Sequence, residues 1–239
     1  MNEIRIAKWS ISKPCRTVAE FLNRPAFSAE AEGTAAAILA EVHEGGNKAV
    51  AECCKRFDDV KLRPSEFRVE REAFAVARQA LNRPYREAVR EAHERISRFA
   101  EAGLKKDWRI SSPRGGELGE RFQPFDRIGA YIPGGAAPLA STALMTVTLA
   151  KVAGGPEIGA CTPSRRNRCV GPHVLYALEV AGATEVYRVG GIQGIGMLAY
   201  GTRTVKPVQK IVGPGGAFVT AAKRQVYGRV ALDLVAGPS

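Results

Sequence analysis

Three glycine-rich loops follow short apolar runs in the second half of this 239-residue chain. They are Pro133-Gly134-Gly135, Gly190-Gly191 and Gly213-Pro214-Gly215-Gly216. Glycine permits backbone angles and close approaches that a side chain prevents, and the free amides of a following helix attract anions such as phosphate. One such loop is typical of any strand end, but three in one chain predict a nucleotide-sized crevice.

The first loop leads directly from an apolar run into a long apolar helix. Pro133 has no N–H to continue the ladder of the preceding strand, and Gly134 allows a tight turn. Ser141 or Thr142 can cap the helix that follows, which leaves free N–H groups at the mouth of the loop. The stretch 127–155 therefore predicts a strand, a tight loop and a helix, with an anion site between them.

The second loop contains a partial match to the dinucleotide-binding fingerprint. Gly194, Gly196 and Ala199 fit the form G-x-G-x-x-A. The fingerprint also needs an acidic residue about twenty positions later to bind the ribose hydroxyl, and the sequence has none there. We therefore interpret these glycines as incidental to nucleotide binding.

Histidines give no sign of a metal site or of a catalytic pair. His43, His93 and His173 lie on different segments, without a cysteine or carboxylate at ligand spacing. His93 is surrounded by Glu and Arg, a pattern typical of a solvated helix face, and His43 suits the C-terminus of a helix. The sequence thus predicts no metal-ligating and no catalytic residues.

The chain is basic, with a net charge of +11 from 35 Lys and Arg against 24 Asp and Glu residues. A surplus of this kind suits anionic metabolites or nucleic acid. The basic residues are scattered over helix faces, apart from a cluster at Arg165, Arg166 and Arg168, and aromatic residues make up only 7%. No nucleic-acid motif is recognised, so we expect a small-molecule substrate and no nucleic-acid partner.

Neither a membrane nor an oxidising compartment is indicated. The longest apolar stretch, 136–150, is too short and too rich in Ser and Thr to span a bilayer, and residues 1–14 lack the apolar core of a signal peptide. The five cysteines show neither a disulfide framework nor a C-x-x-C spacing, which is typical of reduced thiols. These features predict a cytoplasmic protein without a membrane partner.

Helical patterns dominate the first part of the chain. Apolar residues recur at helical spacing in 28–43, 47–57, 71–81 and 85–102. Gly45-Gly46 separates the first two helices, and residues 108–125 alternate weakly around Gly115-Gly116, as in a hairpin. We assign residues 1–125 to an N-terminal arm and a mainly helical portion.

Strand and helix patterns alternate from residue 127 onward. Apolar runs predict five strands, at 128–132, 157–160, 185–189, 210–212 and 230–234, joined by four helices. Connections of this length join the parallel strands of a sheet that is covered on both faces. The sequence predicts an α/β fold in which a Rossmann-like parallel-sheet domain, residues 126–235, follows the mainly helical portion.

Four segments of the sequence resemble histidinol dehydrogenases, the zinc- and NAD-dependent enzymes that complete histidine biosynthesis. They are YIPGGAAPLASTALM (131–145), VGGIQGIGMLAYGT (189–202), KIVGPGGAFVTAAKRQV (210–226) and DLVAGPS (233–239). They occur in the family's order and at about its spacing, and a weaker likeness includes Gly45-Gly46 and Phe57-Asp58. The resemblance implies NAD-dependent oxidation of L-histidinol to L-histidine.

The resemblance also implies site residues. The family's NAD contacts fall on Tyr131, on Gln193 and on an asparagine whose position is occupied here by Gly216. Because glycine has no side-chain amide, one hydrogen bond to the cofactor is expected to be missing. Ser239 matches a family residue that contacts the substrate.

The family's zinc ligands, and its glutamate and histidine that transfer protons, fall beyond Ser239, the last residue of the sequence. We therefore expect a truncated N-terminal half that is inactive alone, with 236–239 as a truncated linker and with the domain of residues 1–125 completed by the missing half. Two alternatives stay open: a stand-alone NAD-binding or regulatory module, and one half of a split enzyme whose partner chain supplies the metal site. A homodimer also stays open.

Overall fold

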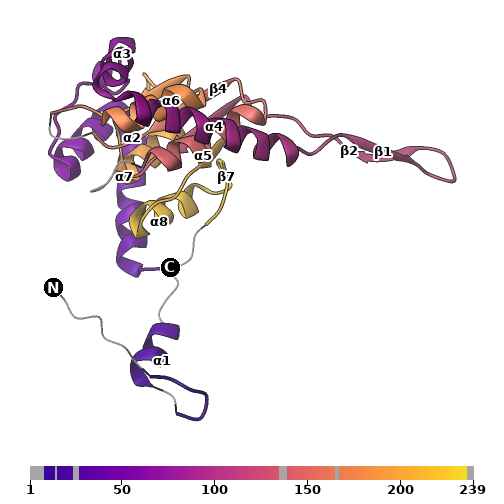
Figure 1. Cartoon of the computed structure of the whole chain (residues 1–239). Coiled ribbons are helices and arrows are strands. Elements are labelled where there is room, and N and C mark those ends of the chain that lie inside the picture. The colour runs from indigo at the N-terminus through magenta and orange to yellow at the C-terminus, as the bar shows by residue number, and fades with distance from the viewer. Residues whose placement is uncertain (1–7, 14, 24–26, 135–138, 165–166, 236–239) are drawn as a thin grey trace.

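The computed structural model describes residues 8–13, 15–23, 27–134, 139–164 and 167–235. A five-stranded parallel sheet lies at its centre (Figure 1). The strands are β3 (Arg127–Tyr131), β4 (Glu157–Cys161), β5 (Glu185–Tyr187), β6 (Lys210–Val212) and β7 (Ala231–Leu232). Their order across the sheet is β5-β4-β3-β6-β7. The chain therefore adds β4 and β5 on one side of β3, and then adds β6 and β7 on its other side. In such sheets ligands bind where the direction reverses, here between the carboxyl ends of β3 and β6.

Four helices connect these strands and cover the sheet on both faces. They are α5 (Ala140–Val152), α6 (Pro172–Ala181), α7 (Gly191–Tyr200) and α8 (Ala217–Val226). α5 packs with α6 on one face, and α7 packs with α8 on the other. Every residue of β3 is buried, as expected for a central strand between two helical layers.

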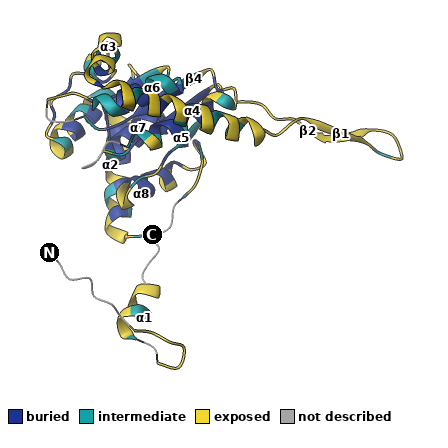
Figure 2. Cartoon of the chain, in the orientation of Figure 1, coloured by how far each residue is buried: buried dark blue, intermediate teal, exposed yellow. Residues whose placement is uncertain are grey.

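Helices from the first part of the chain form an outer layer. α2 (Ala29–Asp58) packs on α7 and α8, while α3 (Arg71–Ala80) packs on α6 and α4 (Arg83–Ala102) packs on α5. The 3-10 helix η1 (Pro64–Glu66) links α2 to α3, and the short helix α1 (Arg16–Leu22) contributes no buried residue. Figure 2 shows a buried interior beneath exposed outer helix surfaces.

Two helix starts follow local sequence signals. Ser28 caps α2 by accepting a hydrogen bond from the Ala31 N–H at 3.3 Å, and Asn82 caps α4 by accepting one from the Tyr85 N–H at 2.9 Å. Gly46 has a φ of 50°, and it kinks α2 at the place where two separate helices were expected.

The cap expected for α5 is wrong. Ser141 and Thr142 lie inside this helix, which begins at Ala140 and has Leu139 as its N-cap residue without a side-chain hydrogen bond. Leu139 and Ala140 pack against the apolar core, and this burial places the start of the helix ahead of the two hydroxyl side chains.

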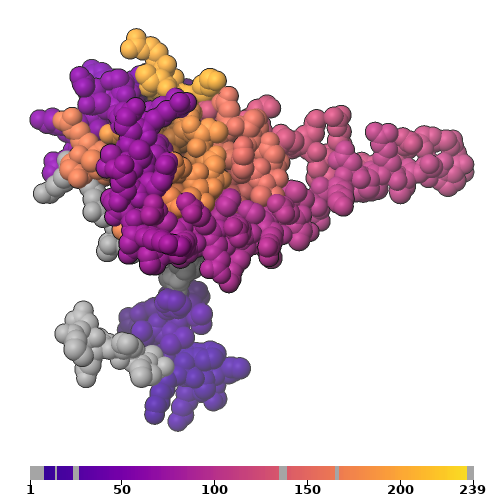
Figure 3. Space-filling view, turned by 45° about the horizontal axis from the view of Figure 1, so that its top comes forward, coloured from indigo at the N-terminus to yellow at the C-terminus, as the bar shows by residue number. Residues whose placement is uncertain are grey.

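An antiparallel hairpin projects from the body of the molecule. β1 (Trp108–Ser111) pairs with β2 (Glu117–Glu120), and Gly115 and Gly116 supply positive φ angles in the turn. All residues of both strands are exposed, and Figures 1 and 3 show the hairpin extending away from the helices. The hairpin expected within residues 108–125 is confirmed.

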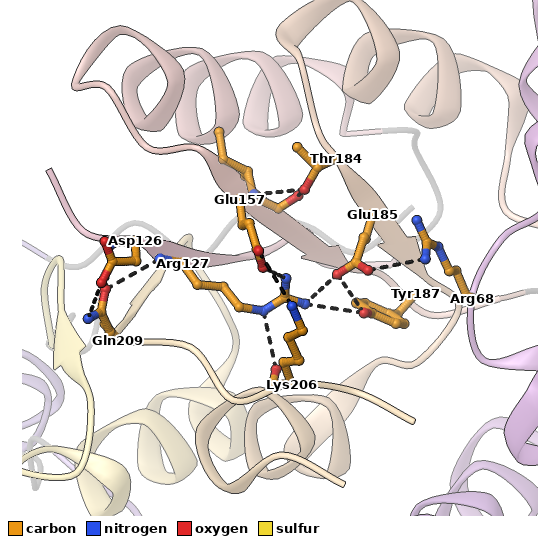
Figure 4. A network of polar contacts seen from close by, with 10 residues as sticks. Arg68, Asp126, Arg127, Glu157, Thr184, Glu185, Tyr187, Lys206 and Gln209 are labelled. Atoms are coloured by element: carbon orange, nitrogen blue, oxygen red, sulfur yellow. Dashed lines mark hydrogen bonds and ion pairs between the residues drawn. The ribbon is translucent and has the colours of Figure 1, made fainter. Parts of the chain in front are cut away.

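A buried arginine joins the amino ends of three neighbouring strands (Figure 4). The guanidinium of Arg127, a residue only 7% exposed, contacts Glu157 of β4 at 2.6 Å, Glu185 of β5, and the Tyr187 hydroxyl at 3.3 Å. Burial raises the pKa of the Glu185 carboxyl, but hydrogen bonds from Arg127 and Tyr187 outweigh it, so this pKa lies below its usual value. The cluster ties the strands together at the end of the sheet opposite the glycine loops.

The α/β fold with a Rossmann-like parallel sheet is confirmed. The division between residues 1–125 and 126–235 stays a prediction, and the early helices pack directly on the helices that cover the sheet. None of the helices in the described part of the chain is both long enough and apolar enough to cross a membrane.

Candidate functional site

A cavity of about 530 Å³ opens at the carboxyl ends of the parallel strands. Its wall is made by the three glycine loops, the segment after β4, the region around α6 and the end of α2. The residues that line it are Asp58, Tyr131, Pro133, Gly134, Leu139, Thr162, Pro163, Ser164, Val170, Gly171, Val174, Gly191 and Gly216. A volume of this size lies within the range typical of cofactor sites, so the fold brings the three loops together as one nucleotide-sized pocket.

Glycine is required in these loops because the backbone segments pass very close to one another. A Cβ on Gly134 would lie 2.3 Å from Pro163 Cγ, and one on Gly190 would lie 2.5 Å from Pro163 Cβ. A Cβ on Gly213, whose φ is +116°, would lie 2.2 Å from the carbonyl oxygen of Tyr131. These glycines therefore let the described loop segments pack closely against one another beside the cavity.

Tyr131 places a phenol at the end of β3, on the cavity wall. Its side chain is buried, and its hydroxyl oxygen accepts a hydrogen bond from the Gly191 N–H at 3.0 Å. Burial raises the pKa of the Tyr131 hydroxyl to about 12, although the hydrogen bond from Gly191 acts in the opposite direction. The phenol is protonated at neutral pH, so its O–H remains a donor for a ligand in the cavity.

Gln193 lies in the first turn of α7, behind the cavity wall. It is 2% exposed, and its Nε2 donates a hydrogen bond to Asp58 Oδ2 at 3.1 Å. Among the described residues, Asp58 lines the cavity and Gln193 does not. The structure therefore brings Tyr131 and Gly216 to one cavity and connects Gln193 to it through Asp58.

Gly216 is the N-cap residue of α8 and lines the cavity. A Cβ at this position would meet no atom within 4 Å, so a side chain there has open space. Within the described chain no side chain caps this helix, which leaves the amides of its first turn for a ligand.

The third loop is braced by a partly buried ion pair that sequence reasoning did not single out. Lys223 is 4% exposed, and its Nζ donates to the Gly213 carbonyl at 2.7 Å and to Asp233 Oδ1 at 2.6 Å. The other carboxylate oxygen of Asp233 accepts from the Gly213 N–H at 2.7 Å. Ser239, the expected substrate contact, lies outside the described residues.

Asp58 is also a site residue that sequence reasoning missed. Burial raises the pKa of its carboxyl above the usual value, against the opposing effect of the Gln193 hydrogen bond. It lies 135 residues before Gln193, so no local spacing connects them. The available signal was the Phe57-Asp58 pair, which belongs to the weaker family likeness.

The partial fingerprint glycines serve helix packing. A Cβ on Gly196 would lie 3.1 Å from Val42 and 3.2 Å from Leu39, both on α2, and one on Gly194 would lie 3.0 Å from the Val189 carbonyl oxygen. These glycines let α7 approach α2 and its own loop closely, and neither is among the residues that line the cavity.

Each histidine has a partner, and none of the three is among the residues that line the cavity. His43 packs against Tyr200 with ring centroids 4.7 Å apart, and His173 packs edge-on against Tyr85 at the same distance. His93 Nδ1 lies 3.0 Å from the Thr148 hydroxyl, so this side chain contacts α5 rather than lying on a solvated face as expected. The described residues contain no group of three or more His, Cys, Asp or Glu side chains able to hold a metal ion.

Comparison with known proteins agrees with this architecture. The family model for histidinol dehydrogenase matches residues 23–239. The histidinol dehydrogenase of Symbiobacterium thermophilum is 43% identical over 222 residues, covering 92% of this chain and 51% of the relative. That of Methanothermobacter thermautotrophicus is 43% identical over 225 residues, covering 94% and 52%.

A crystal structure of histidinol dehydrogenase from Elizabethkingia anophelis superposes with a TM-score of 0.84 at 32% identity, covering 93% of this chain and 52% of that chain. The chain thus spans about half the length of the curated relatives it matches. The likeness includes the sheet, the glycine loops and the early helices, and it shows that the chain belongs to the histidinol dehydrogenase family.

Proposed function

We propose that this chain binds NAD in the cavity at the carboxyl ends of the strands and takes part in the oxidation of L-histidinol to L-histidine. The observation that carries the proposal is the meeting of three glycine loops around one cavity beside the Tyr131 hydroxyl. Membership of the histidinol dehydrogenase family supports the reaction and the class of substrate, a small amino alcohol.

The residues present fit a dinucleotide. The first-turn amides of α8 beside Gly216 suit a phosphate, because an uncapped helix N-terminus favours negative charge. The Tyr131 hydroxyl orients the ligand as a hydrogen-bond donor, and the Gly191 N–H holds that hydroxyl in place. When bound, NAD accepts a hydride from the alcohol carbon of the substrate.

The described residues do not fit a zinc site, because they bring together no group of side chains able to hold the metal. We propose that turnover uses residues from the other half of the family's polypeptide, in the same chain or in a partner chain. A stand-alone NAD-binding or regulatory module is the second candidate. A cytoplasmic location is part of the proposal, and the five free cysteines support it.

Calorimetric titration with NAD tests the binding site. Tyr131→Phe removes the phenol donor and is expected to weaken NAD binding about fivefold, the effect of one net hydrogen bond of about 1 kcal/mol. Tyr227→Phe is the matched control, because Tyr227 is 72% exposed and does not line the cavity. Absence of NAD binding by the wild-type chain, or equal affinity in Tyr131→Phe, would reject this cavity as the cofactor site.

An NADH absorbance assay with histidinol and Zn²⁺ then separates the candidate functions. Formation of NADH by the chain alone indicates a complete enzyme. Formation only after addition of the separately expressed second half of a full-length relative indicates a split enzyme. NAD binding without NADH in either experiment indicates a binding module.

A further inference from the structure

Asp58 places a carboxylate on the cavity wall at a position that is unfavourable for negative charge. It is the last residue of α2, and a helix C-terminus favours cations over anions. The side chain is partly buried, and within the described chain its carboxylate forms no ion pair. Its hydrogen-bond partner is the neutral amide of Gln193. If the side chain at position 58 only closed the cavity wall, a neutral side chain there would make the protein more stable.

The Gln193 amide holds the carboxylate in one orientation. Gln193 is 2% exposed and donates to Oδ2 of Asp58 at 3.1 Å, so one carboxylate oxygen is fixed from behind the cavity wall. An ionised carboxylate offers about four acceptor sites on its two oxygens. The described residues supply one hydrogen bond to it, which leaves acceptor capacity for a ligand in the cavity that Asp58 lines.

The polarity of the cavity indicates which ligand group Asp58 meets. A phosphate is repelled by a carboxylate and is attracted to the uncapped N-terminus of α8 at Gly216. Hydrogen-bond donors elsewhere on the same ligand, such as hydroxyl groups, therefore suit the position beside Asp58. In nucleotide sites with parallel sheets, an acidic side chain that accepts from ribose hydroxyls has this function.

We propose that Asp58 accepts hydrogen bonds from a ribose diol of the bound dinucleotide. The partial fingerprint has no acidic residue at the expected spacing after its glycine loop. Asp58 supplies this carboxylate from the end of α2 instead. The inference rests on the proposed NAD site and assigns a hydroxyl-binding residue within it. Gln193 is a positioning residue in this arrangement, because it acts on the ligand through Asp58.

A cycle of one variant and two modified ligands tests the proposal. Asp58→Asn keeps the shape and an oxygen that can accept from Gln193, and it removes the charge. The ligands are NAD, NAD without the 2′-hydroxyl on the adenosine ribose, and NAD without it on the nicotinamide ribose. Calorimetric Kd values are measured for all six combinations, with thermal melting to check that the variant is folded.

The wild-type chain is expected to bind one deoxy ligand about tenfold or more weakly than NAD, because a hydrogen bond to a charged group is lost. Asp58→Asn should bind NAD weaker by a similar factor and show no further loss with that same ligand. The affected ligand identifies which ribose Asp58 contacts.

Two results overturn the proposal. If Asp58→Asn binds each deoxy ligand with a Kd raised by the product of the two separate factors, Asp58 acts on the fold and not on a hydroxyl. If the wild-type chain binds both deoxy ligands as tightly as NAD, the proposal fails without any variant. Failure of NAD itself to bind is a different result, because it removes the proposed function together with this inference.

Discussion

Introducing a side-chain amide at residue 216 tests whether the third glycine loop contacts the cofactor. In Gly216→Asn the new side chain enters open space, because a Cβ at this position meets no atom within 4 Å. The backbone angles of φ −70° and ψ −178° are ordinary for any residue, so no strain is expected. Asparagine is also a better N-cap than glycine by a few tenths of a kcal/mol, and α8 should be slightly more stable.

NAD binding to Gly216→Asn is expected to strengthen by up to about fivefold. One net hydrogen bond contributes about 1 kcal/mol, and 1.4 kcal/mol corresponds to a tenfold change in Kd. The gain reaches this value when the amide turns to the ligand, and it is smaller when the amide caps α8 instead. Calorimetric titration with NAD measures the Kd, and thermal melting reports the cap.

Gly228→Asn is the matched control for this variant. Gly228 also has open space around its Cβ and lies outside the cavity, and asparagine tolerates its φ of +96° better than most residues. NAD affinity should be unchanged in this control. An unchanged or weaker affinity in Gly216→Asn, at a melting temperature equal to that of the wild-type chain so that the new amide does not cap α8, would refute the assignment of the third loop to the cofactor.

Three further predictions concern stability. Arg127→Ala leaves Glu185 without its main cation, and urea unfolding should show that the free energy of unfolding falls by about 3 kcal/mol or more. Arg95→Ala breaks an exposed ion pair and should change the free energy of unfolding by less than about 1 kcal/mol. The folded-state pKa of Glu185 lies below its ordinary value of 4.5, so its contribution is present above that pH and is lost as the pH falls through the folded pKa. Unfolding followed from pH 7 to pH 3 should therefore show a steeper acid loss in the wild-type chain than in Arg127→Ala, and parallel profiles would contradict this. Gly196→Ala should lose about 1–3 kcal/mol of stability in urea unfolding, because the new methyl group overpacks against α2. Gly33→Ala, with open space around its Cβ at an exposed helix position, should gain up to about 1 kcal/mol. Equal effects of the two variants would contradict the packing role of Gly196.

Periodic features of the sequence were sufficient to predict the sheet. Each strand is a short apolar run between breakers, and β6 was expected at 210–212, where it is observed. Such features are local, since burial on both faces of a parallel strand selects apolar side chains at most positions after the charged first residue. Helix starts were less predictable, because the burial of Leu139 decided where α5 begins and its hydroxyl residues did not.

The parts of the site that escaped prediction are contacts between separate elements of the fold. Asp58 meets Gln193 across 135 residues, and Lys223 and Asp233 meet Gly213 at the ends of β6 and β7, which lie side by side. Neither pair has a spacing that a pattern can describe. In each case a charged residue with no local explanation becomes interpretable when its burial and its partner are known.

The glycines of the partial fingerprint contribute to the cavity in an indirect way. Gly196 lets α7 lie against Leu39 and Val42 of α2, and α7 carries Gln193 one turn earlier on the same helix. The close approach of these helices allows a hydrogen bond between Gln193 and Asp58, which lies at the far end of α2 beyond the kink at Gly46. A larger residue at position 196 would separate the helices and with them the amide and the carboxylate. The sequence pattern that resembles a phosphate loop therefore acts through helix packing, and the acidic group of the cavity is positioned by a helix that precedes the sheet in the chain.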